Sequence, residues 1–255
     1  MKVISLYSGS QGNSTLVDTG TTRLLIDAGG SYKALTDALC RAGYHISEIS
    51  DIFITHEHSD HTHALPVLLK KHPIRIHMTS PTAEALGIEK GSPLDICTVR
   101  YENEFEVTLS DGTRISSFLA PHDSVCCVGY RIDNGEDSVG VVTDIGYVTQ
   151  RVYDCLCGCK AVVIEANHDK EMVRCGSYPA ALKRRILSGG GHLSNDDCAE
   201  ISAALARKGT KNILLAHLSL ENNTENVALE TVNKAVSDYG VKVKCAQRDE
   251  ITDFV

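Results

Sequence analysis

The pattern of apolar and polar positions divides the chain into two halves of similar order. In each half, short β-rich segments come first and alternating strands and helices follow. In the first half the expected strands are Val3–Tyr7, Thr15–Asp18, Arg23–Asp27, Ile49–Thr55 and Ile74–Met78. The expected helices are Ser31–Ala42, His63–His72 and a short helix that begins at Ser80 and Pro81.

The second half repeats this order. Its expected strands are Val99–Tyr101, Phe105–Leu109, Arg114–Ala120, Val125–Ile132, Ser138–Thr143, Ala161–Glu165, Ile213–Ala216 and Val241–Cys245. Its expected helices are Val148–Leu156, Ser194–Lys208, capped by Ser194 with Asp197, and Glu225–Tyr239. Two such halves predict an α/β fold in which two mixed sheets pack face to face with helices outside, a four-layer αβ/βα sandwich. No long linker interrupts the pattern, so we expect one domain over residues 1–255.

Composition and charge narrow the function classes. The chain has 255 residues, 25 Lys and Arg against 33 Asp and Glu, and a formal net charge of −8. This charge argues against sequence-blind adhesion to nucleic acid over the whole surface, although a local basic groove is compatible with it. Aromatic residues make up 5% and Trp is absent, so an extended platform for stacking bases is not expected.

Ten cysteines and eleven histidines stand out in the composition. No apolar stretch has the length of a signal peptide core or of a membrane span, so a cytoplasmic location with reduced thiols and no membrane contact is expected. The cysteines form one cluster, Cys155, Cys157 and Cys159. Small, buried and inert thiols are the preferred interpretation of this cluster, ahead of a soft-metal or redox site.

The densest chemistry lies in the segment Thr55-His56-Glu57-His58-Ser59-Asp60-His61. It follows an apolar strand and precedes a helix. The polar side-chain atoms of its three histidines and its carboxylates need hydrogen-bond or metal partners when they are buried. Imidazole nitrogen binds zinc and other first-row metals, and a carboxylate also tolerates harder ions. In an extended turn, His56 and His58 point to one side while Asp60 and His61 reach a second point, so one motif can serve two metals.

This motif resembles the metal-binding motif of the metallo-β-lactamase superfamily, and later segments match in order. Asp27 corresponds to a structural Asp that supports the ligand loop, and His122, Asp144 and His217 correspond to later ligands. The resemblance implies one metal held by His56, His58 and His122 and a second held by Asp60, His61 and His217, with Asp144 shared. The expected cofactors are therefore two divalent ions, with zinc or manganese preferred and iron as a further option.

Two other segments indicate a branch of the superfamily. Ser8-Gly9-Ser10-Gln11-Gly12-Asn13-Ser14 is similar to the opening of the nuclease and phosphodiesterase branches, with Ser10 and Asn13 in supporting positions. Glu165-Ala166-Asn167-His168-Asp169 and the stretch from Leu182 to Asn195 resemble the YycJ/WalJ group, which contains metal-dependent nucleases. Glu165 and His168 are expected near the site, although a solvated loop is an equally good interpretation for His168. The motifs leave the role of His63 open.

The resemblance also implies roles in the reaction. Asp60, Asp144 and His192 are the expected catalytic residues, with His192 as the proton donor to the leaving oxygen. Lys183, Arg184 and Arg185 form a basic patch that either binds phosphates or is a solvated helix end. Only residues 145–216 separate Asp144 from His217, which leaves no room for a β-CASP or other inserted domain.

The expected function is dinuclear-metal-dependent hydrolysis of phosphodiester bonds, and the resemblance implies a 5′-to-3′ DNA exonuclease. The alternatives are a phosphodiesterase for cyclic or modified nucleotides and a glyoxalase-type thioesterase. The expected partner is DNA or a nucleotide. A homo-oligomer is compatible with an open cleft that a partner subunit completes.

Overall fold

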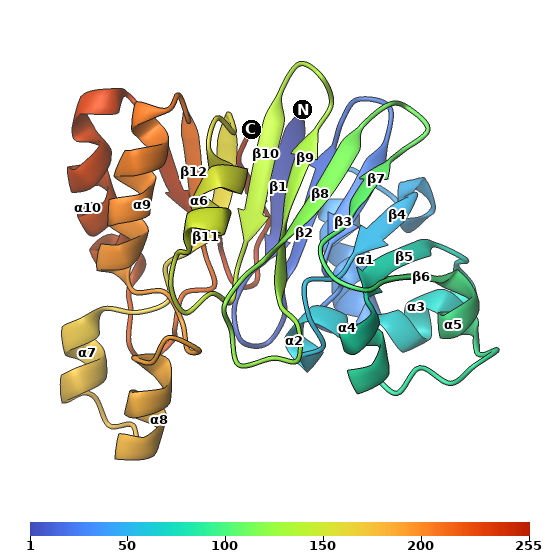
Figure 1. Cartoon of the computed structure of the whole chain (residues 1–255), viewed down its shortest axis with the longest axis horizontal. Helices are drawn as coiled ribbons and strands as arrows, with labels where there is room; N and C mark the ends of the chain where they lie inside the picture. Colours follow the sequence, from blue (N-terminus) through green and yellow to red (C-terminus); the bar gives the residue numbers. More distant parts are fainter.

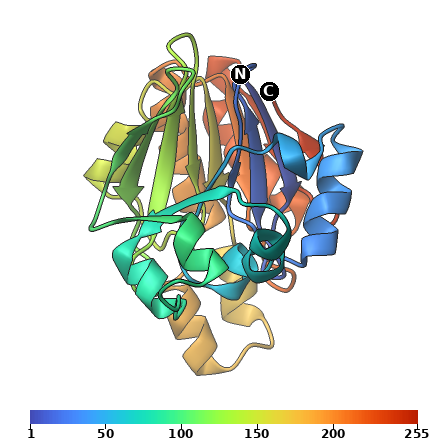
Figure 2. The same cartoon turned by 90° about the vertical axis from the view of Figure 1, so that its right-hand side faces the viewer.

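Two seven-stranded sheets face each other, with helices on the outer side of each (Figures 1 and 2). The computed structural model describes all 255 residues. One sheet contains, in spatial order, β14 (Thr252–Asp253), β1 (Lys2–Tyr7), β2 (Ser14–Asp18), β3 (Arg23–Ile26), β4 (Asp51–Phe53), β5 (Arg75–Thr79) and β6 (Thr98–Tyr101). The other contains β13 (Lys242–Cys245), β12 (Asn212–Ala216), β11 (Ala161–Glu165), β10 (Ser138–Val142), β9 (Val128–Asp133), β8 (Arg114–Leu119) and β7 (Glu106–Thr108).

The helices form the outer layers. The first sheet packs against α1 (Tyr32–Arg41), α3 (Leu65–Lys71), α4 (Ser80–Ala85) and α5 (Pro93–Cys97). The second packs against α6 (Gln150–Leu156), α9 (Asn195–Arg207) and α10 (Glu225–Val236). A third apolar cluster, with Phe53 and Tyr130 among its members, fills the space between the sheets. The four-layer sandwich expected from the sequence is therefore confirmed.

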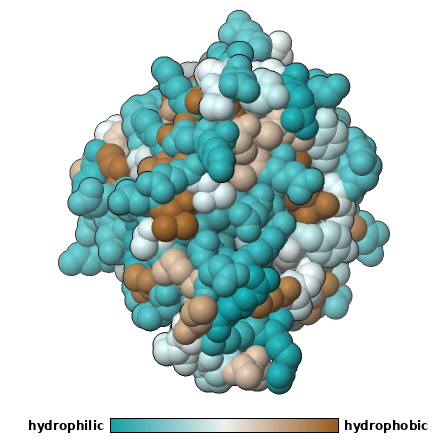
Figure 3. Space-filling model, turned by 90° about the vertical axis from the view of Figure 1, so that its left-hand side faces the viewer, coloured by the Kyte–Doolittle hydropathy of each residue, from teal (hydrophilic) through white to brown (hydrophobic).

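Short helices lie near one end of the sandwich. They are α2 (Ser59–Thr62), α7 (Lys170–Cys175) and α8 (Ala180–Ile186), all in the lower part of Figure 1. Two 3-10 turns, Ile46–Glu48 and Ser237–Tyr239, complete the elements. Figure 3 shows that the side of the molecule turned left in Figure 1 is mostly hydrophilic, with hydrophobic side chains in small separate groups. None of the helices combines the length and apolar character that crossing a bilayer requires.

Strand direction brings the polar loops together. In each sheet, antiparallel pairs give way to parallel ones, so that β3 runs parallel to β4 and β10 runs parallel to β11, which runs parallel to β12. Parallel strands end at the same edge, and ligands in such sheets bind beyond the carboxyl ends of the strands. The segments that follow these strands contain the residues singled out by the motifs.

Several predicted boundaries differ from the structure. The expected strand Ile49–Thr55 is limited to β4, because Thr55 turns toward the site, and the expected strand Val125–Ile132 begins only at Val128. The expected helix His63–His72 is instead α3, preceded by α2, and His63 lies exposed between the two. The sequence pattern missed α5, α7, α8 and β14, which are too short to show a clear periodicity. Ser194 does cap α9, as expected.

Candidate metal centre

All seven residues expected as metal ligands lie in one cluster at the edge where the parallel strands end. Their donor atoms form overlapping groups that are compact enough to hold an ion, and one further group adds Glu165 and His192 to Asp144 and His217. Asp144 is central. Its Oδ2 lies 3.0 Å from His61 Nε2, and its Oδ1 lies 3.4 Å from His217 Nδ1 and 3.8 Å from His122 Nε2. One buried carboxylate thus faces imidazoles contributed by both sheets.

The histidines share one orientation. The Nδ1 atom of His56 lies 3.0 Å from Thr55 Oγ1, that of His122 lies 3.1 Å from the Gly191 carbonyl, and that of His217 lies 2.8 Å from Glu165 Oε1. The Nε2 atom of each of these three histidines is buried and has no hydrogen-bond partner in the protein. Because buried polar atoms are normally paired, three unpaired Nε2 atoms that belong to the same cluster fit metal coordination.

His58 is the exception to this pattern. Its side chain is about one-third exposed, and no hydrogen bond from another side chain holds its ring. It lies in the cluster through ring contacts, with its centroid 4.5 Å from that of His56 and 5.3 Å from that of His122. His58 is thus placed by its backbone and by ring contacts with His56 and His122.

Asp27 supports the loop that follows β4. Its Oδ2 accepts a hydrogen bond from His61 Nδ1 at 2.7 Å, and its Oδ1 accepts one from the Thr55 backbone at 2.8 Å. The carboxylate fixes the tautomer of His61 with the proton on Nδ1, so Nε2 is left to face Asp60 and Asp144. The structure places Asp27 against the loop that contains the histidine motif, in contact with Thr55 and His61.

The loop between β1 and β2 makes a second support, with one correction. Asn13 Nδ2 donates to Asp60 Oδ2 at 3.2 Å, and Ser8 Oγ accepts from the His217 backbone at 2.9 Å. Ser10, which was expected in a supporting role, is exposed and makes no side-chain hydrogen bond, because the loop turns its side chain outward. Ser8 fills that role, and the repeated Ser-Gly pattern gave no means of telling the two serines apart.

Close backbone packing requires glycine beside this loop. A Cβ at Gly29 would lie 1.7 Å from the Asp60 carbonyl oxygen, so no other residue fits there without moving the ligand loop. The non-glycine residues with positive φ in the chain are Asp27 at 64°, Asp144 at 53° and His217 at 56°. Such conformations cost roughly 1–3 kcal/mol each and gather at functional sites. Strain in this molecule is concentrated at the candidate site.

Glu165 supports the other half of the cluster. Its Oε1 lies 2.8 Å from the Nδ1 atoms of both His192 and His217, and its Oε2 accepts from the backbones of Ile145 at 2.9 Å and Leu193 at 3.1 Å. All four partners are donors, so the fully buried carboxylate is satisfied as an anion. Glu165 thereby connects three loops through one side chain.

Charge in the cluster favours a cation. Burial raises the pKa of Glu165, but the charge and hydrogen bond of His192 outweigh burial and lower the pKa to about 2. Burial lowers the pKa of His217, yet the neighbouring carboxylates, first that of Asp144, raise it to about 10. At His56, burial and the charge of His61 together lower the pKa to about 2. Although burial acts to raise it, His217 and His61 hold the pKa of the buried Asp144 carboxyl well below its usual range, so Glu165 and Asp144 remain ionised and place negative charge in the cluster.

The remaining candidates are divided between the site and its surroundings. His168 is buried, not solvated, and neither of its ring nitrogens has a partner. Lys183 donates to the Arg174 carbonyl at 2.8 Å and Arg184 is exposed without a partner, while Arg185 pairs with Asp123, the neighbour of His122. Of the basic patch, only Arg185 lies beside the cluster. None of the candidate ion-holding groups includes a cysteine, and Cys155, Cys157 and Cys159 are free thiols.

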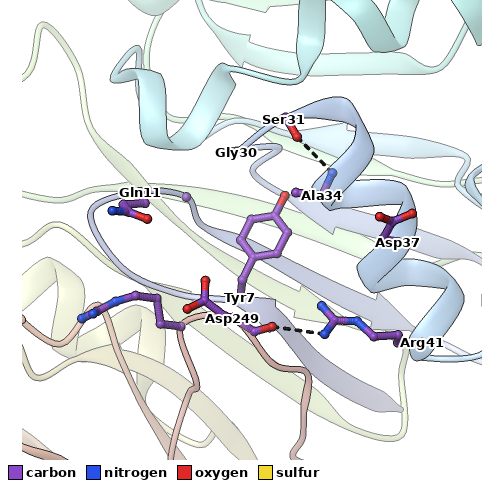
Figure 4. A pocket seen from close by; sticks show the side chains of 10 residues that line it. Tyr7, Gln11, Gly30, Ser31, Ala34, Asp37, Arg41 and Asp249 are labelled. Carbon is purple, nitrogen blue, oxygen red and sulfur yellow. Dashed lines mark hydrogen bonds between the residues drawn. The ribbon is translucent and has the colours of Figure 1, made fainter.

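Residues of the loop from Ser8 to Ser14 line two cavities. One, of about 540 Å³, is lined by Tyr7, Gln11, Arg41 and Asp249 among others, and Figure 4 shows Arg41 on α1 bonded to the Asp249 carbonyl. It contains no residue of the histidine cluster. The other, of about 680 Å³, is lined by His192 and His217 and by Ser10. Of these two cavities, the second adjoins the candidate metal centre.

Comparison with known proteins agrees with this geometry. The model of the beta-lactamase superfamily domain matches residues 22–218. A solved structure of the metallo-beta-lactamase fold protein YhfI from Bacillus subtilis superposes with a TM-score of 0.74 at 17% identity, covering 99% of this chain and 98% of that one. The chain therefore belongs to the beta-lactamase superfamily.

Relatives that are similar in sequence indicate a group within this superfamily. Exodeoxyribonuclease YycJ of Bacillus anthracis is 36% identical over 243 residues, which is 93% of this chain and 90% of the relative. Exodeoxyribonuclease WalJ of Streptococcus pneumoniae is 40% identical over 241 residues, again 93% of this chain and 90% of the relative. Within the superfamily, the chain is a member of the YycJ/WalJ group.

Proposed function

We propose that this protein is an exodeoxyribonuclease that hydrolyses phosphodiester bonds at a metal centre. The chain is a metal-dependent hydrolase of its superfamily, and relatives that match nine-tenths of it are named exodeoxyribonucleases. The observation that carries the proposal is Asp144, a buried carboxylate that lies between two sets of imidazoles. These relatives favour a nuclease over the phosphodiesterase and thioesterase alternatives.

We assign two ion-binding positions to the cluster. One would be formed by His56, His58 and His122, and the other by Asp60, His61 and His217, with Asp144 shared between them. The unpaired Nε2 atoms of His56, His122 and His217 support this assignment. When bound, two divalent ions would supply positive charge against the phosphate oxygens and would lower the pKa of a water molecule. Zinc or manganese suits this donor set, and iron is compatible with it.

The protein's own groups position the reaction. Asp60 and Asp144 hold negative charge at the centre, and Asp27 and Glu165 keep the histidines in the tautomer that presents Nε2. His192 has its Nδ1 bonded to Glu165 and its ring about one-fifth exposed at the edge of the cluster. Its Nε2 is then free to give a proton to the leaving oxygen, which is a general-acid role. Glu165 acts through these rings and does not reach the substrate.

We also propose that residues 1–255 act as one domain in a reducing, cytoplasmic compartment. Between Asp144 and His217 the chain forms only short elements, namely α6, β11, α7, α8, α9 and β12, which leaves no room for an inserted domain. The open cleft accepts a DNA end directly, and a second copy of the chain is not required to complete the ligand set.

The test is a nuclease assay with DNA labelled at either end, run with a panel of divalent ions. The wild-type protein should shorten the strand from its 5′ end, and EDTA should abolish the activity. His58→Ala should lower the rate at least about 100-fold and remove about one ion per chain, because it deletes one of the four donors at a position. Wild-type rates from His58→Ala in added Mn²⁺ would overturn the mechanism. Release from the 3′ end would overturn the polarity, and hydrolysis of only a cyclic nucleotide or a glutathione thioester would overturn the substrate class.

A further inference from the structure

The cavity beside His192 has the size and shape of a small-ligand pocket. Its volume of about 680 Å³ lies within the roughly 300–1,000 Å³ that such pockets usually have. His192 and His217 form the side shared with the metal centre. The segment Leu218–Glu221 forms one wall, and α8 with the turn before it forms the other.

Its lining combines an apolar surface, one aromatic ring and one cation. Leu182, Ile186 and Leu218 provide the apolar surface, and Tyr178 provides the ring. Arg185 is the cation, Glu221 is the one carboxylate, and serine hydroxyls are interspersed. An apolar and aromatic surface suits a base and a sugar, while an arginine suits a phosphate because its remaining N–H groups can bind two oxygens together. These features fit one nucleotide better than they fit a purely apolar ligand.

The walls of this cavity are held in place by specific contacts. The Asp169 backbone donates to the Asn222 carbonyl at 2.9 Å, which joins the start of α7 to the segment after His217. Lys183 Nζ donates to the Arg174 carbonyl at 2.8 Å, which ties α8 to α7. Arg185 is fixed by Asp123 through its Nε, so its two terminal nitrogens are left for another partner. The cavity is therefore pre-formed, which lowers the ordering cost of binding.

We propose that this cavity holds the 5′-terminal nucleotide of the strand that is being degraded. Tyr178 stacks on its base, and Arg185 binds its 5′-phosphate. The proposal rests on the exodeoxyribonuclease function, and it adds where the end of the strand lies and what recognises it. One nucleotide occupies the cavity, whose volume of about 680 Å³ suits a single small ligand.

The position of His192 connects the cavity to the direction of digestion. With the first nucleotide in the cavity, the phosphate between the first and second nucleotides lies at the metal centre. The 3′-oxygen of the first nucleotide is then on the His192 side. Water bonds to phosphorus, the bond from phosphorus to this 3′-oxygen breaks, and the oxygen takes a proton from His192. The proton of the water goes to solvent, from which His192 is protonated again. The products are a 5′-mononucleotide and a strand with a new 5′-phosphate, which is the next substrate.

The first test concerns Tyr178. Loss of base stacking in Tyr178→Ala should raise KM for a single-stranded oligonucleotide about 5- to 150-fold, with kcat little changed. The inhibition constant of dTMP should rise with it, which measures binding without turnover. Tyr178→Phe should stay near the wild type, because the ring is kept. Tyr147→Ala removes an exposed tyrosine that lies outside this cavity, and it should leave both constants within about twofold.

The second test concerns Arg185. The wild-type protein should degrade a 5′-phosphorylated strand at least about tenfold more efficiently than the same strand with a 5′-hydroxyl, since a bidentate phosphate contact is a strong one. Arg185→Gln should lose this preference. Arg184→Gln removes the same charge from the adjacent, exposed position, and it should affect both strands alike.

Failure of this inference differs from failure of the function. If the wild-type protein degrades DNA but Tyr178→Ala leaves KM and dTMP inhibition unchanged, the terminal-nucleotide pocket is wrong and the nuclease stands. Dinucleotides or longer fragments as first products would also overturn the pocket, as would equal use of both 5′ ends. If the wild-type protein degrades no DNA with any ion, the function itself is overturned. Circular dichroism and metal content confirm in each case that the variant is folded.

Discussion

The two sheets meet at the metal centre, but they supply their side chains in different ways. After β4, the first sheet contributes a contiguous set, His56, His58, Asp60 and His61. The second sheet contributes side chains that are far apart in sequence and follow β8, β10 and β12, namely His122, Asp144 and His217. The first set is ordered largely by the covalent chain, whereas the second set requires that separate loops be held together.

The supports differ accordingly. On the first side, hydrogen bonds made by three residues, Asp27, Thr55 and Asn13, hold the ligand loop. Gly29 allows its own backbone to lie against that of Asp60. On the second side, Glu165 alone accepts four hydrogen bonds from three loops. The difference indicates that support on the first side is spread over several side chains, whereas on the second side one buried carboxylate makes four contacts, beside the Gly191 carbonyl at His122 and Ser8 at the His217 backbone.

Glu165→Gln should therefore have the largest effect. An amide can accept two of the four hydrogen bonds, but its NH₂ group would face the remaining donors in a buried site. Stability should fall by roughly 3–5 kcal/mol, as for a broken buried ion pair, and metal affinity by about 100-fold. Urea unfolding and metal titration measure the two effects. If Glu165→Gln binds metal as tightly as the wild type, the second side does not depend on this carboxylate.

Asp27→Asn should have an intermediate effect on the first side. The amide oxygen can still accept from the Thr55 backbone, but an NH₂ group toward His61 Nδ1 favours the wrong tautomer, with the proton on Nε2. Metal affinity should fall about tenfold to 100-fold, with a smaller loss of stability than in Glu165→Gln because Asn13 and Thr55 remain. NMR of the imidazole nitrogens reports the His61 tautomer directly. A larger loss in Asp27→Asn than in Glu165→Gln would reverse the comparison.

The same contrast explains what could be read from the sequence. The contiguous motif from His56 to His61 is recognisable by spacing alone, because its geometry is set within one turn. His122, Asp144 and His217 are single residues after strands, and only their order in a family pattern singled them out. The positive φ angles of Asp144 and His217 and the unpaired Nε2 atoms of His122 and His217 are properties of the folded chain, which the spacing of residues does not show.

The helices α7 and α8 show more clearly what could not be predicted from the sequence. Each has six or seven residues, fewer than two full turns, so apolar periodicity cannot distinguish them from loops. The basic run from Lys183 to Arg185 could be seen in the sequence, but its meaning could not. Tertiary contacts direct Lys183 to α7 and Arg185 to Asp123, and only Arg185 reaches the cavity. Tyr178 was not singled out, because a lone tyrosine in a polar loop carries no signal.

The smallest effect should come from the loop between β1 and β2. Asn13→Ala removes hydrogen bonds to Asp60, to His61 and within the loop, but the Asn13 backbone still donates to the Asp60 carbonyl at 2.7 Å. Stability should fall by about 1–3 kcal/mol, and metal affinity by less than about tenfold.

Ser10→Ala is the matched control, three residues earlier in the same loop. Because the Ser10 side chain is exposed and unpaired, the unfolding free energy of Ser10→Ala should stay within about 0.5 kcal/mol of the wild type. Calorimetric unfolding and metal titration of the pair test this. Equal losses in Asn13→Ala and Ser10→Ala would mean that the loop acts as a whole and that Asn13 is not its point of contact with the centre.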